Sequence, residues 1–202
     1  MLPYENKKIK LFLKELSSDA PVPGGGSAAA LTGALGAALL EMAAGINAKR
    51  EFKKTHKVSP QAKSRIKKLS KIRFTLLKAI TEDAQAFQRL SRAFKFEKSS
   101  AIYQNALKNG AQVPLNTCQA CVDAMEFGVP EIERTSRFLA SDVAEAGILL
   151  DAAFLSARFN VLINLKEIQD KALADKISLK LSALAHRSSE LKDKLVSILN
   201  ND

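Results

Sequence analysis

The sequence has no tryptophan, and its 202 residues include only two tyrosines, two histidines and two cysteines. So few histidines argue against Ser-His and Cys-His nucleophilic chemistry, and they leave a zinc site without most of its usual ligands. Two tyrosines offer little stacking surface for the bases of a nucleic acid. We therefore expect neither a bound metal nor a nucleic-acid partner.

Strand patterns are missing as well. No stretch shows a sustained alternation of Val, Ile or Thr with polar residues, whereas apolar residues recur with helical spacing along the chain. No internal repeat, low-complexity linker or composition break divides the sequence. These patterns predict an all-α fold with a single domain over residues 1–202, a multi-helix bundle of roughly six helices.

The helix boundaries follow from caps, breakers and periodicity. In the first helix, Ile9, Phe12, Leu13 and Leu16 are expected to face inward. The expected elements are an amphipathic helix over residues 4–17, an apolar helix over 27–47, a long helix from the Ser59-Pro60 capping pair to about residue 94, a helix that Pro114 kinks or interrupts, a helix that Ser141 caps, and a last helix over 170–199.

The apolar helix over residues 27–47 is either a membrane span or a buried helix of the bundle. It begins at Ser27, a good N-cap after the glycines of PVPGGGS, and it is apolar nearly all round. It is about long enough to cross a bilayer, yet it is rich in Ala and Gly, carries Glu41 and has no flanking aromatic belt. We expect a buried Ala/Gly-rich central helix and no membrane association. The first ten residues lack the apolar core of a signal peptide, so a cytoplasmic location is expected.

The two cysteines, Cys118 and Cys121, form a CQAC spacing. This spacing is found in redox pairs and in half of some metal sites. No second cysteine pair completes such a metal site. Two cysteines three residues apart in a helix also lie on one face, as small core residues do, and we expect that role here.

Positive charge is concentrated in one segment. Residues 49–98 contain 16 Lys and Arg against 4 Asp and Glu, while the whole chain has a net charge of +10. Such a segment fits an anionic partner, and it fits a merely solvated basic helix equally well.

An acidic residue interrupts the inward seam of the long helix. The seam follows steps of three and four residues and includes Leu76, Ile80, Asp83, Phe87 and Leu90. A buried carboxylate must be paired, protonated or placed beside a cavity that requires it. Asp83 is therefore either part of a buried salt bridge or an acid-base group with a shifted pKa.

Polar residues also stand out in the apolar stretch over residues 141–165. Ser156, Asn160 and Asn164 are one turn apart on one stripe, and buried Asn side chains need hydrogen-bond partners. Asp142 faces the same side as Asn160 but lies about 27 Å away along the axis of a straight helix. These residues either serve different purposes, or a partner subunit brings the two ends together.

Six motifs occur in a distinctive order: PVPGGGSAAALTGALGAALLEMA, AKREF, EDAQAF, AQVPL, SDVAEA and NVLINLKEIQD. Together they resemble the formiminotransferase-cyclodeaminase family, in its cyclodeaminase domain, and the related methenyltetrahydrofolate cyclohydrolases. The resemblance covers about residues 11–170. It implies an all-helical homodimeric enzyme that acts on one-carbon units of tetrahydrofolate and uses no cofactor beyond that substrate.

The resemblance also implies roles for individual residues. Asp83 of EDAQAF matches the catalytic aspartate of the family. In one place the chain departs from the family, because Thr135-Ser136 stands where a Gly-Asn pair is usual, and this departure puts folate affinity or specificity in question. The positions that match substrate-binding residues are Pro23, Gly24, Gly25, Gly26, Ser27, Lys49, Asp142, Asn160 and Asn164.

Two reactions fit the resemblance. In cyclodeamination, 5-formiminotetrahydrofolate closes to 5,10-methenyltetrahydrofolate and releases ammonia. In the cyclohydrolase reaction, water opens the methenyl compound to 10-formyltetrahydrofolate. Both pass through a tetrahedral carbon and need an acid-base group, so residue types do not separate them. The basic segment would attract a polyglutamate tail, and it also leaves open a non-catalytic helical module that binds an anionic partner.

Overall fold

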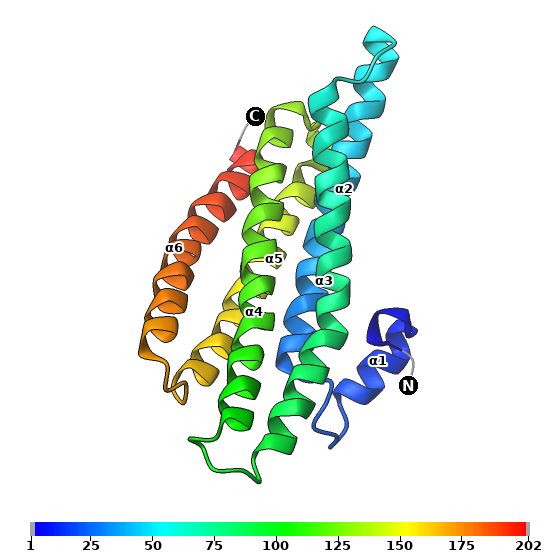
Figure 1. The fold of residues 1–202 in the computed structure, drawn as a ribbon. Helices are drawn as coiled ribbons and strands as arrows, with labels where there is room; N and C mark the ends of the chain where they lie inside the picture. Colours follow the sequence, from blue (N-terminus) through cyan, green and yellow to red (C-terminus); the bar gives the residue numbers. More distant parts are fainter. Residues whose placement is uncertain (1–2, 201–202) are drawn as a thin grey trace.

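The computed structural model describes residues 3–200, and most of them are helical. Five long helices run up and down the molecule, and short 3-10 turns and loops join them (Figure 1). Residues 3–200 contain no β-strand, so the all-α prediction is confirmed. The α-helices are α1 (Ile9–Leu16), α2 (Gly25–Thr55), α3 (Pro60–Ala93), α4 (Ala101–Gly128), α5 (Ala140–Leu165) and α6 (Lys171–Val196).

Successive long helices are antiparallel, so α2 and α5 run in opposite directions and pack side by side. The helix α4 touches all four of the other long helices, α2, α3, α5 and α6. As a result, the start of α2, the end of α3, the start of α4 and the end of α5 all lie at one end of the bundle (Figure 1).

The core is filled by Leu, Ala and a few larger side chains. Leu40, Leu76, Leu150 and Phe154 are completely buried. The backbones of α2 and α5 approach closely at Gly36, where an added Cβ would lie only 2.8 Å from Cγ of Leu150. Small residues on α2 therefore determine how tightly it packs on α5.

The two most apolar helices are only partly covered. Both α2 and the segment Arg137–Leu165 are long and apolar enough to span a membrane, and 50% and 39% of their apolar windows are buried. Leu35 of α2 and Ile148 of α5 are both 53% exposed, and Phe159 of α5 is 66% exposed. In a single chain, α2 is thus a core helix with one open apolar face.

Several predictions about the elements are confirmed. The side chain of Ser59 caps α3 by accepting a hydrogen bond from the Ala62 N–H. Cys118 and Cys121 are buried in the core, and burial raises the pKa of the Cys118 thiol to about 12. Both cysteines are therefore packing residues with unreactive thiols.

Some details were predicted wrongly. Ser27 does not cap α2, which begins at Gly25 with Gly24 at the N-cap position. The first helix is shorter than expected, and Ile9 and Leu13 are 72% and 52% exposed, whereas Phe12 and Leu16 pack on the core as predicted. Of the two effects expected of Pro114, a kink or an interruption, the interruption is wrong, because α4 continues through this residue. Ser141 does not cap α5, which begins at Ala140 after a short 3-10 turn.

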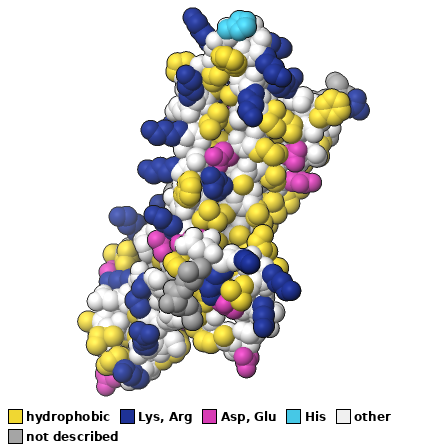
Figure 2. Space-filling model, turned by 90° about the vertical axis from the view of Figure 1, so that its right-hand side faces the viewer, with side chains coloured by type: hydrophobic (Ala, Val, Ile, Leu, Met, Phe, Trp, Pro, Cys, Tyr) yellow, Lys and Arg dark blue, Asp and Glu magenta, His cyan; other side chains and the backbone are white. Residues whose placement is uncertain are grey.

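The basic segment forms the end of α2 and most of α3. Figure 2 shows Lys and Arg side chains on both sides of a band of apolar side chains in the upper part of this face. Two of its arginines form ion pairs at 2.7 Å, Arg65 with Glu131 and Arg73 with Glu41. The remaining lysines give this end of the molecule a positive surface.

Candidate active site

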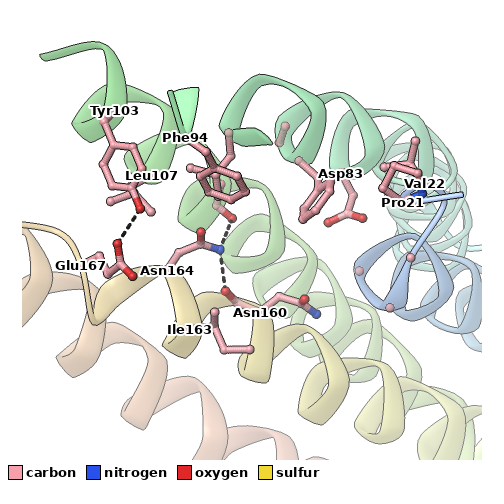
Figure 3. Close-up of a pocket in the computed structure, with 17 residues that line it drawn as sticks. Pro21, Val22, Asp83, Phe94, Tyr103, Leu107, Asn160, Ile163, Asn164 and Glu167 are labelled. Atoms are coloured by element: carbon pink, nitrogen blue, oxygen red, sulfur yellow. Dashed lines mark hydrogen bonds between the residues drawn. The ribbon is translucent and has the colours of Figure 1, made fainter. Parts of the chain in front are cut away.

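A cavity of about 360 Å³ lies at the end of the bundle where α2 begins (Figure 3). The glycine loop forms one wall, α3 and α4 form the roof, and the end of α5 forms the floor. Its lining residues are Pro21, Val22, Gly24, Gly25, Gly26, Asp83, Ala86, Phe87, Leu90, Phe94, Tyr103, Leu107, Gly110, Asn160, Ile163, Asn164 and Glu167.

Asp83 is held against the first turn of α2. Its Oδ2 lies 3.0 Å from Oγ of Ser27, and an added Cβ on Gly26 would overlap its carboxylate. Burial raises the pKa of Asp83, and hydrogen bonds from the side chain and backbone of Ser27 partly oppose this rise. Asp83 has no ion-pair partner in the described part of the chain, so the buried salt bridge is excluded there. A carboxyl with these properties is suited to acid-base chemistry.

A second acidic group closes the far end of the cavity. The Tyr103 hydroxyl donates to Oε2 of Glu167 at 2.5 Å, and Nζ of Lys98 is 3.1 Å from the same oxygen. The hydrogen bond from Tyr103 and the ammonium of Lys98 lower the pKa of Glu167. Glu167 is therefore a carboxylate at neutral pH.

The wall between these two acidic groups is mostly apolar. Phe87, Leu90, Phe94 and Leu107 supply most of this surface, which suits a flat aromatic ligand. Among the described residues that line the cavity, none is a lysine or an arginine. The cavity is thus matched to an uncharged ring system with hydrogen-bond donors and not to a polyanion.

Asn164 has a structural partner. Pro114 has no N–H, so the carbonyl of Gly110 lacks its usual helical donor, and Nδ2 of Asn164 donates to this carbonyl at 3.2 Å. The same Nδ2 also donates to the carbonyl of Asn160 at 2.8 Å. This side chain explains how α4 tolerates Pro114, and its amide oxygen lies close to the backbone of Gly110.

The residues expected to bind substrate fall into two groups. Asp83, Gly24, Gly25, Gly26, Asn160 and Asn164 all line the cavity, while Pro23 and Ser27 are buried just behind it. Lys49 and Asp142 lie at the opposite end of the bundle. Within α2, the 22 residues from Ser27 to Lys49 span about 33 Å, so one chain does not bring the two groups together.

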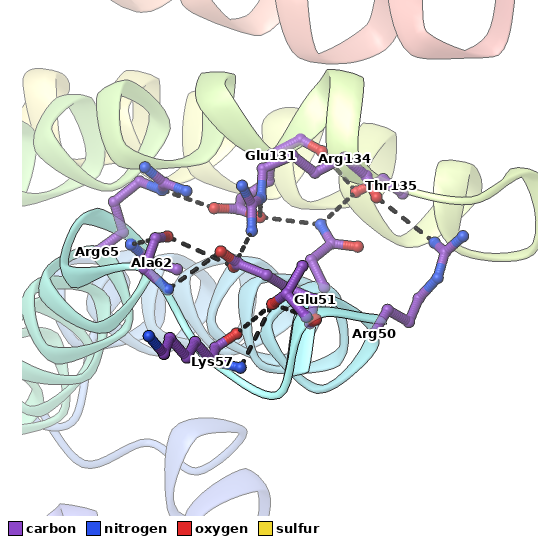
Figure 4. A network of polar contacts seen from close by, with 11 residues as sticks. Arg50, Glu51, Lys57, Ala62, Arg65, Glu131, Arg134 and Thr135 are labelled. Atoms are coloured by element: carbon purple, nitrogen blue, oxygen red, sulfur yellow. Dashed lines mark hydrogen bonds and ion pairs between the residues drawn. The ribbon is translucent and has the colours of Figure 1, made fainter. Parts of the chain in front are cut away.

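Thr135 belongs to a buried polar network at that opposite end (Figure 4). Glu131 is 1% exposed, and its carboxylate accepts hydrogen bonds from Arg65 Nε at 2.7 Å and Asn47 Nδ2 at 2.9 Å. Thr135 accepts from the same Asn47 amide and donates to the Glu131 carbonyl. The residue that departs from the family pattern thus has a structural role within its own chain.

Tyr103, Gly110 and Glu167 were not anticipated from the sequence. Tyr103 and Glu167 are 64 positions apart. Tyr103 belongs to none of the six motifs, and Glu167 lies in NVLINLKEIQD but was not singled out there. Phe87 was predicted to be a core residue because it follows the seam of α3, yet it is 41% exposed and lines the cavity. Phe94, two turns further on at the end of α3, lines the cavity as well and is 57% exposed. Helical spacing predicts burial at such positions, and only the folded chain shows that the side chains face the cavity.

Comparison with known proteins adds to this geometry. A family model described as formiminotransferase-cyclodeaminase matches residues 8–183. The chain belongs to the formiminotransferase-cyclodeaminase family. The resemblance found from the six motifs is therefore confirmed, and the cavity with Asp83 lies within the matched part of this family member.

Relatives of this family member carry two names. A methenyltetrahydrofolate cyclohydrolase of Methylorubrum extorquens is 32% identical over 198 residues, which are 94% of each chain. The formimidoyltransferase-cyclodeaminase of Sus scrofa is 28% identical over 193 residues, and the match spans only 34% of that longer protein. A crystal structure of formiminotetrahydrofolate cyclodeaminase from Thermotoga maritima is 28% identical, covers 97% of both chains and superposes with a TM-score of 0.88.

Proposed function

We propose that this protein closes 5-formiminotetrahydrofolate to 5,10-methenyltetrahydrofolate and releases ammonia. The observation that carries the proposal is Asp83, a carboxyl with a raised pKa and no cationic partner in the described chain, in an apolar cavity of a family member. The cavity volume of about 360 Å³ is in the range of small-molecule sites.

The reaction needs one proton acceptor and one proton donor. N10 attacks the formimino carbon, and its proton must leave when the new C–N bond forms. The nitrogen that departs as ammonia must gain a proton when the other C–N bond breaks. Asp83 can take the first proton as a carboxylate and return a proton as a carboxylic acid, because its raised pKa keeps both forms accessible.

The cavity favours one orientation of the folate. The apolar wall suits the pterin and aminobenzoyl rings, and the Glu167 carboxylate at the far end suits the N–H donors of the pterin edge. Since no described lining residue is cationic, the glutamate carboxylates of the substrate lie outside this cavity. Glu167→Gln should therefore raise KM more than it lowers kcat.

Hydrolysis of 5,10-methenyltetrahydrofolate to 10-formyltetrahydrofolate is the second candidate. A specific observation favours it, because the Methylorubrum extorquens relative that bears this name matches over 94% of both chains. Asp83 would then take one proton from the attacking water and return it to N5 as the ring opens, while the second proton of the water leaves the hydroxyl to solvent as the formyl C=O forms. The same carboxyl serves both reactions.

An absorbance assay of methenyltetrahydrofolate separates the candidates. Appearance from the formimino substrate supports cyclodeamination, and accelerated disappearance of added methenyl compound supports hydrolysis. Asp83→Asn should lower either rate at least about a hundredfold, whereas Glu82→Gln on the exposed side of α3 should not. A fully active Asp83→Asn variant, or no activity in either direction, would reject the proposal.

We further infer a cytoplasmic homodimer that pairs through the open apolar face of α2 and α5. The exposed side chains Leu35, Met42, Ile148, Leu155 and Phe159 form this face. Covering them with a second copy removes apolar surface from water without a membrane. Leu155→Asp should give a monomer by sedimentation velocity, whereas Leu179→Asp on the exposed side of α6 should leave a dimer.

A two-fold dimer would also give a role to Lys49 and Asp142, the two expected residues that lie far from the cavity in their own chain. Because α2 and α5 are antiparallel, Lys49 and Asp142 lie at the same end of the bundle. A two-fold axis in the plane of the interface and perpendicular to both helices brings this end of one copy to the Asp83 end of the other. Lys49 would then supply the cation that the cavity lacks, for the glutamate carboxylates or a polyglutamate tail.

Mixing two inactive variants tests this arrangement. Asp83→Asn and Lys49→Glu should each be inactive alone, and re-associated mixtures should recover up to about a quarter of wild-type activity through heterodimers with one intact site. No recovery from a mixture shown to contain heterodimers would reject a site shared between the two copies.

A further inference from the structure

Ser27 has two hydrogen-bond acceptors and one proton to give. Its side chain is completely buried behind the cavity. Its Oγ lies 3.0 Å from Oδ2 of Asp83 and 2.9 Å from the carbonyl oxygen of Ile80, one turn earlier on α3. A hydroxyl donates one hydrogen bond at a time and can accept others, so it cannot donate to both oxygens at once.

The geometry points to Ser27 as the positioning residue for Asp83, whose hydroxyl proton turns between Asp83 and the Ile80 carbonyl so that the carboxyl is hydrogen-bonded in both of its protonation states. This inference rests on the catalytic role proposed for Asp83. It adds a residue that does not touch substrate and acts only through the carboxyl group.

In its ionised state, Asp83 accepts hydrogen bonds from Ser27. The Ser27 hydroxyl donates to Oδ2, and the backbone N–H of Ser27, in the first turn of α2, adds a second stabilising hydrogen bond. The positive end of the α2 dipole favours the same charge. The Ile80 carbonyl keeps its helical hydrogen bond and needs no second donor.

In the protonated state, the direction reverses. A proton on Oδ2 can be donated to Oγ of Ser27, and the Ser27 proton then turns to the Ile80 carbonyl 2.9 Å away, which has a second lone pair. Only the hydroxyl hydrogen moves between the two states.

This matters for a group that must act as base and acid in one turnover. A carboxyl satisfied in only one state would be fixed in that state, because burial makes an unsatisfied polar group costly. The neighbouring Gly26 contributes by leaving room, since an added Cβ would overlap the carboxylate. Ser27 and Gly26 thus explain why the glycine loop is followed by a hydroxyl at this position.

The test measures the Asp83 titration in the substrate-free protein by NMR of the aspartate carboxyl carbon, with Asp83→Asn to assign the signal. Ser27→Ala should raise the pKa of Asp83 by about one pH unit, because the bond to the carboxylate is stronger than the bond from the acid. Ser27→Cys, a weaker donor, should give a smaller rise. Thr32→Val, which removes a hydroxyl that bonds only to the Ala28 carbonyl, should give none.

The pH profile of kcat supplies the second readout. In Ser27→Ala its acidic limb should move upward with the NMR value while KM stays close to that of the wild type. An unchanged Asp83 titration in a folded Ser27→Ala or Ser27→Cys variant would overturn the inference and leave Ser27 as a packing residue. If the wild type shows no folate activity, the proposed function fails, and the NMR titration still decides the role of Ser27.

Discussion

The carboxylate of Asp83 lies directly against the backbone of Gly26, so closely that a Cβ at this position would overlap it. The third glycine of the loop is therefore required by the aspartate from α3. By contrast, an added Cβ on Gly25 would find no atom within 4 Å. Of these two adjacent glycines, Gly26 is thus required by a steric contact and Gly25 is not.

Gly26→Ala should displace Asp83 and lower activity by about a hundredfold, because a misplaced acid-base group loses its contact with the substrate. Steady-state rates measure this loss. Gly45→Ala, in the middle of α2 with no atom within 4 Å of the added Cβ, is the matched control. It should keep full activity and stabilise the helix by about 0.5–1 kcal/mol.

The raised pKa of Asp83 makes stability depend on pH. The folded state holds the Asp83 proton more tightly than the unfolded state, whose ordinary pKa is 3.8. The stabilisation is complete below that value and is lost as pH rises through the higher folded value. Asp83→Asn has no charge to bury, so it should melt at a higher temperature than the wild type at pH 8, by a margin that shrinks toward pH 4.

The stability difference between Asp83→Asn and the wild type depends on how far the pKa of Asp83 is raised, because proton binding and folding are linked. Each pH unit by which the pKa is raised corresponds to about 1.4 kcal/mol of unfolding free energy. Asp175→Asn, at an exposed position of α6, is the control and should show no pH-dependent margin. A constant difference between Asp83→Asn and wild type from pH 4 to pH 8 would contradict a raised pKa.

Asp83 could be found from the sequence because helical spacing alone places it among core residues of α3. The spacing does not say which end of the bundle a motif reaches, so Lys49 and Asp142 were grouped with Asp83 although they lie at the other end of the same chain. Tyr103 and Glu167 meet only because α4 and α5 are neighbours. Local patterns thus predicted the helices and the acid-base group, and long-range packing determined the rest of the site.

The network around Glu131 should be a major contributor to stability. Glu131 is 1% exposed and is paired with Arg65, whose side chain is 17% exposed. Glu131→Gln leaves this arginine largely buried without a counter-charge, so the unfolding free energy in urea should fall by about 3 kcal/mol or more. Glu190→Gln breaks only the exposed contacts with Arg187 and His186 and should cost less than about 1 kcal/mol.

Asn164 compensates for Pro114 in a way that only the folded chain reveals. Prolines inside helices leave the carbonyl four residues earlier without its donor, and here that carbonyl belongs to Gly110 and is bonded by Asn164 from α5. The hydrogen bond joins α4 and α5 at the floor of the cavity. The polar stripe on α5 is therefore at least partly a contact between helices, and it gives Asn164 the hydrogen-bond partner expected for a buried Asn side chain.

A double-mutant cycle between these two residues tests the compensation. Asn164→Ala should lower the unfolding free energy by about 1–3 kcal/mol, because it leaves the Gly110 carbonyl unsatisfied. Pro114→Ala restores a backbone N–H to that carbonyl, so in its background Asn164→Ala should cost distinctly less. Urea denaturation at fixed protein concentration gives the four free energies. If Asn164→Ala lowers the unfolding free energy equally in both backgrounds, Asn164 does not replace the donor that Pro114 lacks. Its role would then be substrate binding alone.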